Sequence, residues 1–518
     1  MSTEKKALGR ADITNADTEA GEVHVIPLEK AGIDQQAASK DKALGLLATH
    51  HVNFDPNSTE AKRVLRKIDM RIMPMVFVVY MLQLMDKNSL SFAAIMGIKT
   101  DCHLTAKQYS WLGSIVYFGY LGGEIPATFL MQRFSLSKYF SIMCMLWGIV
   151  VAMHAVCQDF ASLATVRFLL GAIEVCTAPA VIYITGSWYI KSEQITRVAI
   201  WYTTSGWANV FGGLFAFAIN HAKSFKWQGL FVFYGCLTFC MGVILFFFLA
   251  ASPTQASWLT DEEKTIALER VRENKTGSEV WRFNKSQLFE CFTDIRFYMM
   301  FLLLVSTGLP NGGLTAFGPS IIASFGFNTD QSTLLNMGSG ACTVVGTIMA
   351  LYLAKFTGRT IAGCYTLCLS CIGVIMMFVI PAEHYGARYG GYILTQQFGV
   401  CVLFIITFLT AGVGGSTKKF AFGCAYQLGY AVGNIIGPQT YVAKDAPNYY
   451  PAKYTMLAFL LFTIFLLTSY GLIHKMWNNK RDKQDVLDAQ NGIVHEHIEN
   501  EEFADLTDFK LRSFRYPL

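Results

Sequence analysis

Charged residues inside apolar runs are the chemically informative feature of this sequence. Arg167, Gly171 and Glu174 stand at positions i, i+4 and i+7 of one such run, which places them on one face of a helix. An arginine can hold a carboxylate through two parallel hydrogen bonds, and a buried glutamate can gain or lose a proton as its neighbours change. We therefore predict that Arg167 binds an anion and that Glu174 carries a proton. The alternative is a fixed Arg–Glu pair that only holds helices together.

An earlier apolar run carries a second set of polar side chains. Tyr80, Gln83, Lys87 and Ser91 share one helical face, and Asp86 lies next to it. We predict that Gln83 and Lys87 contact an anionic ligand and that Asp86 is a second proton carrier. The alternative is that Lys87 and Asp86 extend to the membrane–water interface.

Three further positions combine an apolar environment with a hydrogen-bonding group. Tyr117 offers a ring and a hydroxyl, as small-molecule sites require; helix packing would explain it equally well. The segment G-L-P-N-G-G at 308–313 predicts a broken helix, in which Asn311 can bind a ligand. Gly429, Gly433 and Gly437 form a row of glycines four apart, which predicts close helix packing. Asn434 lies on the neighbouring face of the same helix. We include Tyr117, Asn311 and Asn434 in the predicted substrate site.

The elements that position these residues are long apolar helices. Of 518 residues, 53% are hydrophobic and only 15% are charged, against about 25% charged residues in soluble domains. Runs of about twenty apolar residues predict membrane-spanning helices. We predict spans at 73–96, 109–131, 138–157, 161–185, 196–220, 228–251, 295–322, 331–354, 361–380, 389–411, 418–442 and 453–474.

This pattern predicts an all-α membrane protein with about twelve transmembrane helices in two six-helix bundles. We expect a disordered cytosolic tail at 1–60, bundles at 61–251 and 295–474, a central cytosolic loop at 252–294 and a cytosolic tail at 475–518. Thr260 and the acidic residues after it predict a short helix in the central loop. The N-terminal flank and every second loop after it carry about three times as many Lys and Arg residues as the loops on the other side. This bias places both termini in the cytosol.

Other function classes find little support in the sequence. The net charge of +5 is spread along the chain and gives no nucleic-acid signature. We predict no bound metal, since no Cys pair has zinc spacing with His. The P-loop motif is absent, so ATP is not expected to drive the protein. We predict that the protein is not an enzyme.

Three predicted spans contain distinctive motifs, which are L-Q-L-M-D-K-N-S-L-S-F-A-A, R-F-L-L-G-A-I-E-V-C-T-A-P-A and K-K-F-A-F-G-C-A-Y-Q-L-G-Y-A-V-G-N-I-I-G-P-Q. The chain ends with D-L-T-D-F-K-L-R-S-F-R-Y-P-L. These motifs and this ending resemble the fungal allantoate permease group of the anion:cation symporters, within the major facilitator superfamily. The chain departs from the superfamily's loop motif, because Gln132 precedes Arg133 where an acidic residue is usual.

The resemblance implies proton-coupled uptake of small organic anions, such as ureido acids or vitamin carboxylates, across the plasma membrane. The expected partners are the substrate, protons and the lipid bilayer, with no cofactor and a monomeric carrier. Two alternatives remain open at this point: an efflux antiporter for a metabolite or drug, and a nutrient receptor that signals without transport.

Overall fold

The structure, a computed structural model, describes residues 25–26, 58–221, 226–272, 284–445, 449–491, 497–498 and 506–518. Most of the predicted disordered tail at 1–60 therefore lies outside the described residues. The first group of helices consists of α3 (Thr59–Met96), α4 (Ile98–Asp101), α5 (Ala106–Arg133), α6 (Leu136–Met153), η1 (His154–Val156), α7 (Phe160–Glu174), α8 (Thr177–Trp188), α9 (Lys191–Tyr202), α10 (Thr204–Asn220) and α11 (Trp227–Phe248).

The second group follows a connecting region made of η2 (Pro253–Gln255), α12 (Asp261–Arg272) and α13 (Lys285–Thr293). It consists of α14 (Ile295–Ala323), α15 (Thr329–Thr357), α16 (Arg359–Val379), α17 (Tyr385–Thr395), α18 (Phe398–Gly412), α19 (Ser416–Gln439), η3 (Ala443–Asp445) and α20 (Tyr450–Gln490). The two-residue strands β1 (Val25–Ile26) and β2 (His497–Ile498) pair in parallel.

Each predicted span coincides with a helix or with two consecutive helices. Within the described ranges, nine of these segments are long and apolar enough to cross a membrane. The other three are α5, α9–α10 and α19, so the count of twelve stays a prediction for them. Gly, Ser, Tyr and charged side chains lower their mean hydropathy, and all three helices contribute residues to the interior cavity described below.

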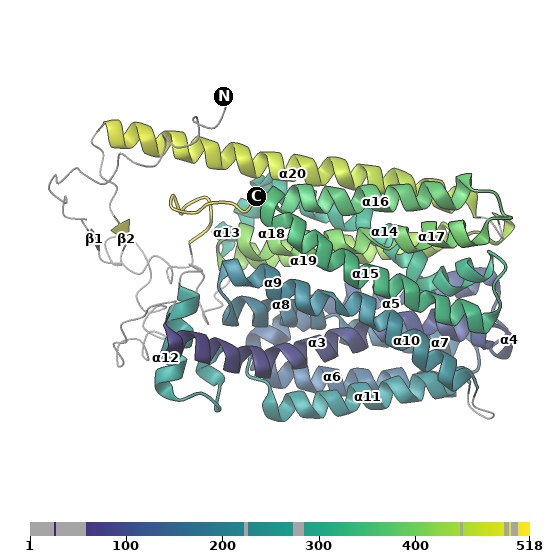
Figure 1. Cartoon of the computed structure of the whole chain (residues 1–518). Coiled ribbons are helices and arrows are strands. Elements are labelled where there is room, and N and C mark those ends of the chain that lie inside the picture. The colour runs from purple at the N-terminus through teal and green to yellow at the C-terminus, as the bar shows by residue number, and fades with distance from the viewer. Residues whose placement is uncertain are drawn as a thin grey trace.

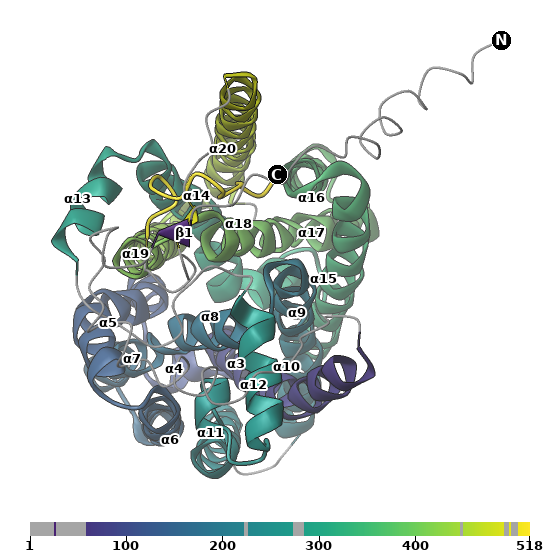
Figure 2. The same cartoon turned by 90° about the vertical axis from the view of Figure 1, so that its left-hand side faces the viewer.

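The two groups of helices lie side by side, as the view along the bundle shows (Figure 2). The start of α3, α12, α13 and the segment 506–518 lie at one end of the bundle, which we call the terminal end (Figure 1). The opposite end, with α4 and the α16–α17 connection, is called the distal end. The helix predicted in the central loop is confirmed as α12, where Thr260 and Glu263 cap each other's backbone N–H groups.

Close packing between α14 and α19 confirms one glycine pattern and corrects another. A Cβ added at Gly429, Gly433 or Gly437 would lie 2.3–2.4 Å from a backbone oxygen of α14, so the glycine row does allow close approach. The predicted break at 308–313 is wrong, because α14 is one continuous helix with Pro310 inside it. Gly308 and Gly312 pack against α19 instead of freeing the backbone; a Cβ at Gly312 would lie 2.7 Å from the Asn434 oxygen.

Candidate substrate site

A cavity of about 120 Å³ lies between the two groups of helices. An engineered protein cavity of about 150 Å³ accommodates benzene, so this space suits a small organic molecule. Its walls come from both groups. They include Tyr80, Gln83, Lys87, Asn88, Ser91, Tyr120, Tyr202, Ser205 and Asn209 from the first group, and Thr307, Asn311, Asn336, Thr343, Tyr392, Gln396, Val402, Tyr426, Gln427 and Tyr430 from the second.

The shared polar face predicted on the first span is confirmed, and it forms a wall of the cavity. Tyr80, Gln83, Lys87 and Ser91 all line the cavity. The side chain of Lys87 is only 10% exposed, and its ammonium lies 3.2 Å from Oε1 of Glu174. Lys87 therefore does not extend to a membrane interface; it places a buried positive charge at the edge of the cavity.

Aromatic rings from both groups of helices surround the Lys87 ammonium. It lies 5.2 Å from the centre of the Tyr120 ring, on α5, and 5.6 Å from that of Tyr430, on α19. Both distances fall within the range of cation–π attraction. The charge on Lys87 is thus held by one group of helices and also contacts the other.

Glu174 is fully buried and has one oxygen occupied and one free. Oε1 accepts a hydrogen bond from the Tyr120 hydroxyl at 2.7 Å, besides its ion pair with Lys87. The Tyr120 hydroxyl in turn accepts from Nε2 of Gln83 at 3.3 Å. Oε2 has no hydrogen-bond partner in the described part of the chain, so it is an available position for a proton.

Asp86 lies on the other side of α3, away from the cavity. Its Oδ2 accepts a hydrogen bond of 3.0 Å from the indole Nε1 of Trp147 on α6. The residue is fully buried, and Oδ1 lacks a partner within the described residues. Asp86 is therefore buried in the first group of helices, as a proton carrier requires, but it does not line the cavity.

Arg167 does not pair with Glu174, so the alternative of a fixed Arg–Glu pair is not what the structure shows. Glu174 pairs with Lys87 instead, while Nε and Nη2 of Arg167 have no partner among the described residues although the side chain is 98% buried. A side cavity of about 20 Å³ adjoins Arg167, Lys87 and Tyr117. This volume is enough for one water, which would satisfy the guanidinium.

Gly171 has a packing role rather than a role in ligand access. A Cβ at this position would lie 1.9 Å from the backbone oxygen of Val116, so the glycine lets α7 pack directly against α5. Gly119 and Gly123 on α5 make matching close approaches to the backbone of α7.

The other predicted site residues fall at different depths. Tyr117 lies outside the main cavity, lines the side cavity and packs against the rings of Tyr120 and Tyr430. Asn311 lines the main cavity, and its Nδ2 donates to the Tyr430 hydroxyl at 2.9 Å and to Oδ1 of Asn434 at 2.8 Å. Asn434 is fully buried behind these groups, so it orients Asn311 rather than facing the cavity.

Several cavity residues were missed by sequence reasoning. They are Tyr202, Asn209, Asn336, Tyr392 and Gln427. Each lies in a predicted span that carries other polar side chains as well, so the sequence does not single it out. The helical face that meets the cavity depends on the packing of neighbouring helices. No cluster of His, Cys, Asp and Glu in the described ranges could hold a metal ion.

At the distal end, hydrogen bonds close the space between the two groups of helices. The Tyr109 hydroxyl donates to the Ala316 oxygen at 2.7 Å. Ser114 donates to the Ile435 oxygen at 2.8 Å and accepts from Gln439 at 3.0 Å. On the distal side of the cavity, therefore, hydrogen bonds join α5 to both α14 and α19.

Comparison with known proteins agrees with this arrangement. Residues 76–438 match the family model described as Major Facilitator Superfamily. The allantoate permease of Saccharomyces cerevisiae is 32% identical over 98% of this chain and 96% of its own length. The thiamine pathway transporter THI73 of the same yeast is 34% identical over 100% of this chain and 98% of its own length.

Solved structures show the same fold. A bacterial homolog of the human lysosomal transporter Spinster, in an inward-facing and unoccupied conformation, has a TM-score of 0.55 at 14% identity. It covers 80% of this chain and 97% of the solved chain. The family and the relatives are transporters rather than enzymes, and apolar helices traverse the whole fold. This chain is a multi-pass membrane protein of the major facilitator superfamily, and it belongs with the fungal transporters that include allantoate permease.

Proposed function

We propose that the protein imports a small organic anion together with a proton, by alternating access, across the plasma membrane. The observation that carries the proposal is the Lys87–Glu174 pair at the cavity edge. A substrate carboxylate that enters the cavity competes with Glu174 for the same ammonium. Once displaced, Glu174 is a buried carboxylate without a cation, and proton uptake removes the cost of that charge.

The energetics favour such coupling. A monoanion entering a cell at −100 mV meets an opposing potential of about 2.3 kcal/mol. One accompanying proton makes the step electroneutral, and each pH unit of gradient then contributes about 1.4 kcal/mol. The carrier needs no further cofactor, and it works as a monomer with its terminal end in the cytosol.

The second proton position and the second cation complete the scheme. Asp86 and Arg167 are buried in the first group of helices, and each has unpaired polar atoms there. In this scheme Arg167 reaches the substrate carboxylate through the side cavity beside Tyr117. Asn311 and Gln83 supply hydrogen bonds from opposite sides of the main cavity.

Uptake into proteoliposomes tests the proposal. The compounds tested are the anions allantoate, nicotinate and pantothenate, and the cation thiamine for comparison. We expect at least one anion to accumulate when the outside is acidic and to stop accumulating when the pH gradient is collapsed. Accumulation of thiamine alone would contradict the proposal, because the cavity presents a lysine. Anion uptake that is independent of the proton gradient would contradict proton coupling.

A further inference from the structure

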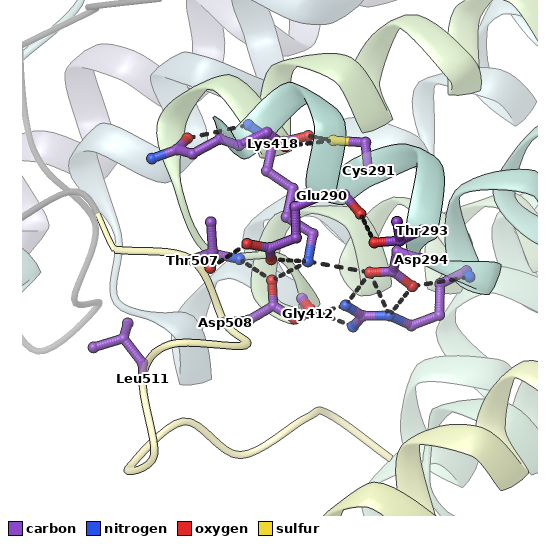
Figure 3. Close-up of polar contacts among 12 residues, drawn as sticks. Glu290, Cys291, Thr293, Asp294, Gly412, Lys418, Thr507, Asp508 and Leu511 are labelled. Atoms are coloured by element: carbon purple, nitrogen blue, oxygen red, sulfur yellow. Dashed lines mark hydrogen bonds and ion pairs between the residues drawn. The ribbon is translucent and has the colours of Figure 1, made fainter. Parts of the chain in front are cut away.

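The described C-terminal segment 506–518 is docked onto the terminal end of the second group of helices (Figure 3). Leu511, Phe514 and Tyr516 are at most 4% exposed and form a small apolar cluster with Trp477 of α20. The segment also exchanges two backbone-to-side-chain hydrogen bonds with Asn478, at 2.8 and 2.9 Å. This docking is an extensive, specific contact rather than a loose apposition.

A buried ion network forms the centre of the docking site. Oδ2 of Asp508 lies 2.6 Å from Nη2 of Arg296, and Oδ1 lies 2.9 Å from Nζ of Lys418. Asp294 contacts the same two cations, and Glu290 contacts Lys418 at 2.9 Å. Arg296, Lys418, Asp294 and Asp508 have fully buried side chains. The charge of Lys418 is therefore used inside the protein.

The network extends to the connection between α18 and α19. The backbone N–H of Gly414 donates to Oδ1 of Asp508 at 3.3 Å, and Nη1 of Arg296 donates to the Gly412 oxygen at 3.1 Å. A Cβ at Gly414 would lie 2.7 Å from the Asp508 nitrogen, so only glycine allows this approach. Asp508 thus holds the end of α18 and, through Lys418, the first turn of α19.

Both of these helices form a wall of the substrate cavity. Val402 on α18 and Tyr426 and Tyr430 on α19 line it, and Tyr430 contacts the Lys87 charge. We propose that the C-terminal segment is a strap that sets the position of α18 and α19, with Asp508 as its positioning residue. The strap belongs to the transport machinery because it controls how far this wall can move.

The strap stays charged under physiological conditions. Burial alone would raise the pKa of Asp508, but the charges of Arg296 and Lys418 hold it below its ordinary value. The carboxylate therefore remains ionised throughout the pH range in which a transporter works. The strap is a constant constraint and not a pH sensor.

Two measurements on purified full-length protein test the strap, and neither needs a substrate. The first is hydrogen exchange of the amides at 412–418 and 506–518. The second is the maleimide labelling rate of Ser205→Cys, a cavity position on α10, after the exposed cysteines Cys236, Cys240 and Cys368 are replaced by serine. The variant is Asp508→Asn, which keeps the side-chain shape and removes the charge.

We expect Asp508→Asn to accelerate exchange in both segments at least tenfold and to change cavity labelling at least threefold. The matched control is Asp485→Asn, which also breaks ion pairs between α20 and the segment, with Arg512 and Arg515, but at a solvent-exposed position. It should leave both readouts within twofold of the native protein. Asp508→Glu keeps the charge but moves it by one methylene, so it should give rates between those of the native protein and those of Asp508→Asn.

Three outcomes would overturn the proposal. One is unchanged exchange at 412–418 in Asp508→Asn. Another is a lower melting temperature with unchanged cavity labelling, which would leave the segment a purely structural role. The third is an equal effect of Asp485→Asn. If Asp508→Asn cannot be purified, Asp508→Glu takes its place, because it keeps the charge and shifts it by one methylene. It should still raise the exchange rate at 412–418 measurably. An unchanged rate would count against the strap.

Discussion

Replacing Glu174 by Gln separates the charge of this side chain from its shape. A glutamine oxygen can still accept the hydrogen bond from Tyr120, which is 2.7 Å long in the native protein. The charge 3.2 Å from the Lys87 ammonium is lost. At an effective dielectric constant of about 20, that attraction amounts to about 5 kcal/mol. A substrate carboxylate must offset part of this attraction in the native protein but not in the variant.

The expected signature is a loss of pH dependence. If one proton enters with each anion, the native dissociation constant falls about tenfold per pH unit of acidification, or about a hundredfold between pH 7.5 and 5.5. In Glu174→Gln the dissociation constant should change less than about threefold over the same range. Titration calorimetry on the purified native protein and variant measures both dissociation constants, with the anion that the uptake assay identifies as ligand. Accumulation driven by a pH gradient should fall steeply, while exchange of labelled for unlabelled substrate should survive in part.

Two comparisons make the result decisive. Glu124→Gln is the control. Glu124 lies on α5 and is buried, as Glu174 is on α7, but it has no ion pair in the described structure. The pH dependence of the dissociation constant in this variant should match that of the native protein. Asp86→Asn tests the rival proton carrier. If Glu174→Gln keeps the full pH dependence and Asp86→Asn abolishes it, the proton is carried on α3 and the reasoning is refuted. If neither variant matters, proton–anion symport itself must be given up.

Four further outcomes follow from other contacts. Lys87→Ala should weaken binding of an anion at least tenfold more than binding of its neutral amide, as measured by calorimetry; equal losses would show that Lys87 does not sense charge. Arg167→Ala should abolish uptake while surface delivery stays near native, whereas retention of misfolded protein would show a structural role. The melting-temperature difference between native protein and Asp508→Asn should stay constant from pH 8 to 5. The folded protein lowers the pKa of Asp508, so the carboxylate stabilises the fold fully at any pH above its ordinary pKa of 3.8; this stabilisation is lost only as the pH falls through the lower pKa of the folded state. Gly206→Ala should lower both uptake and melting temperature, because its Cβ would lie 2.3 Å from a backbone oxygen of α15. Gly186→Ala on α8, whose Cβ would meet nothing within 4 Å, should be nearly neutral in the same assays.

Hydrophobic runs and helical spacing were sufficient for the parts of this protein that depend on one helix at a time. The cavity face of α3 and the glycine row of α19 are both confirmed, because each follows from residues three or four positions apart on one helix. The partner of Glu174 could not be predicted in this way. Spacing shows that Arg167 and Glu174 share a face, but only tertiary packing decides that α3 brings Lys87 to within 3.2 Å.

The burial of Lys418 could not be predicted for the same reason. Its partners come from α13, from the junction of α13 and α14, and from the C-terminal segment, where Asp508 is 90 residues further along the chain. The break predicted at 308–313 failed because α19 packs against those glycines and leaves α14 continuous. Local composition could not reveal that contact.

The observed Lys87–Glu174 pair suits a rocking carrier better than the alternative pair between Arg167 and Glu174. A pair between Arg167 and Glu174 would lie within α7 alone, so motion between the two groups of helices would not disturb it. Lys87 instead joins Glu174 on α7 to the ring of Tyr430 on α19. Whatever draws Lys87 away from Glu174, whether a substrate anion or a proton on the carboxylate, also changes a contact across the interface that must open and close. The proton, the anion and the interface therefore act on one ammonium group, which is the simplest way for binding at the cavity to bias movement of the helices around it.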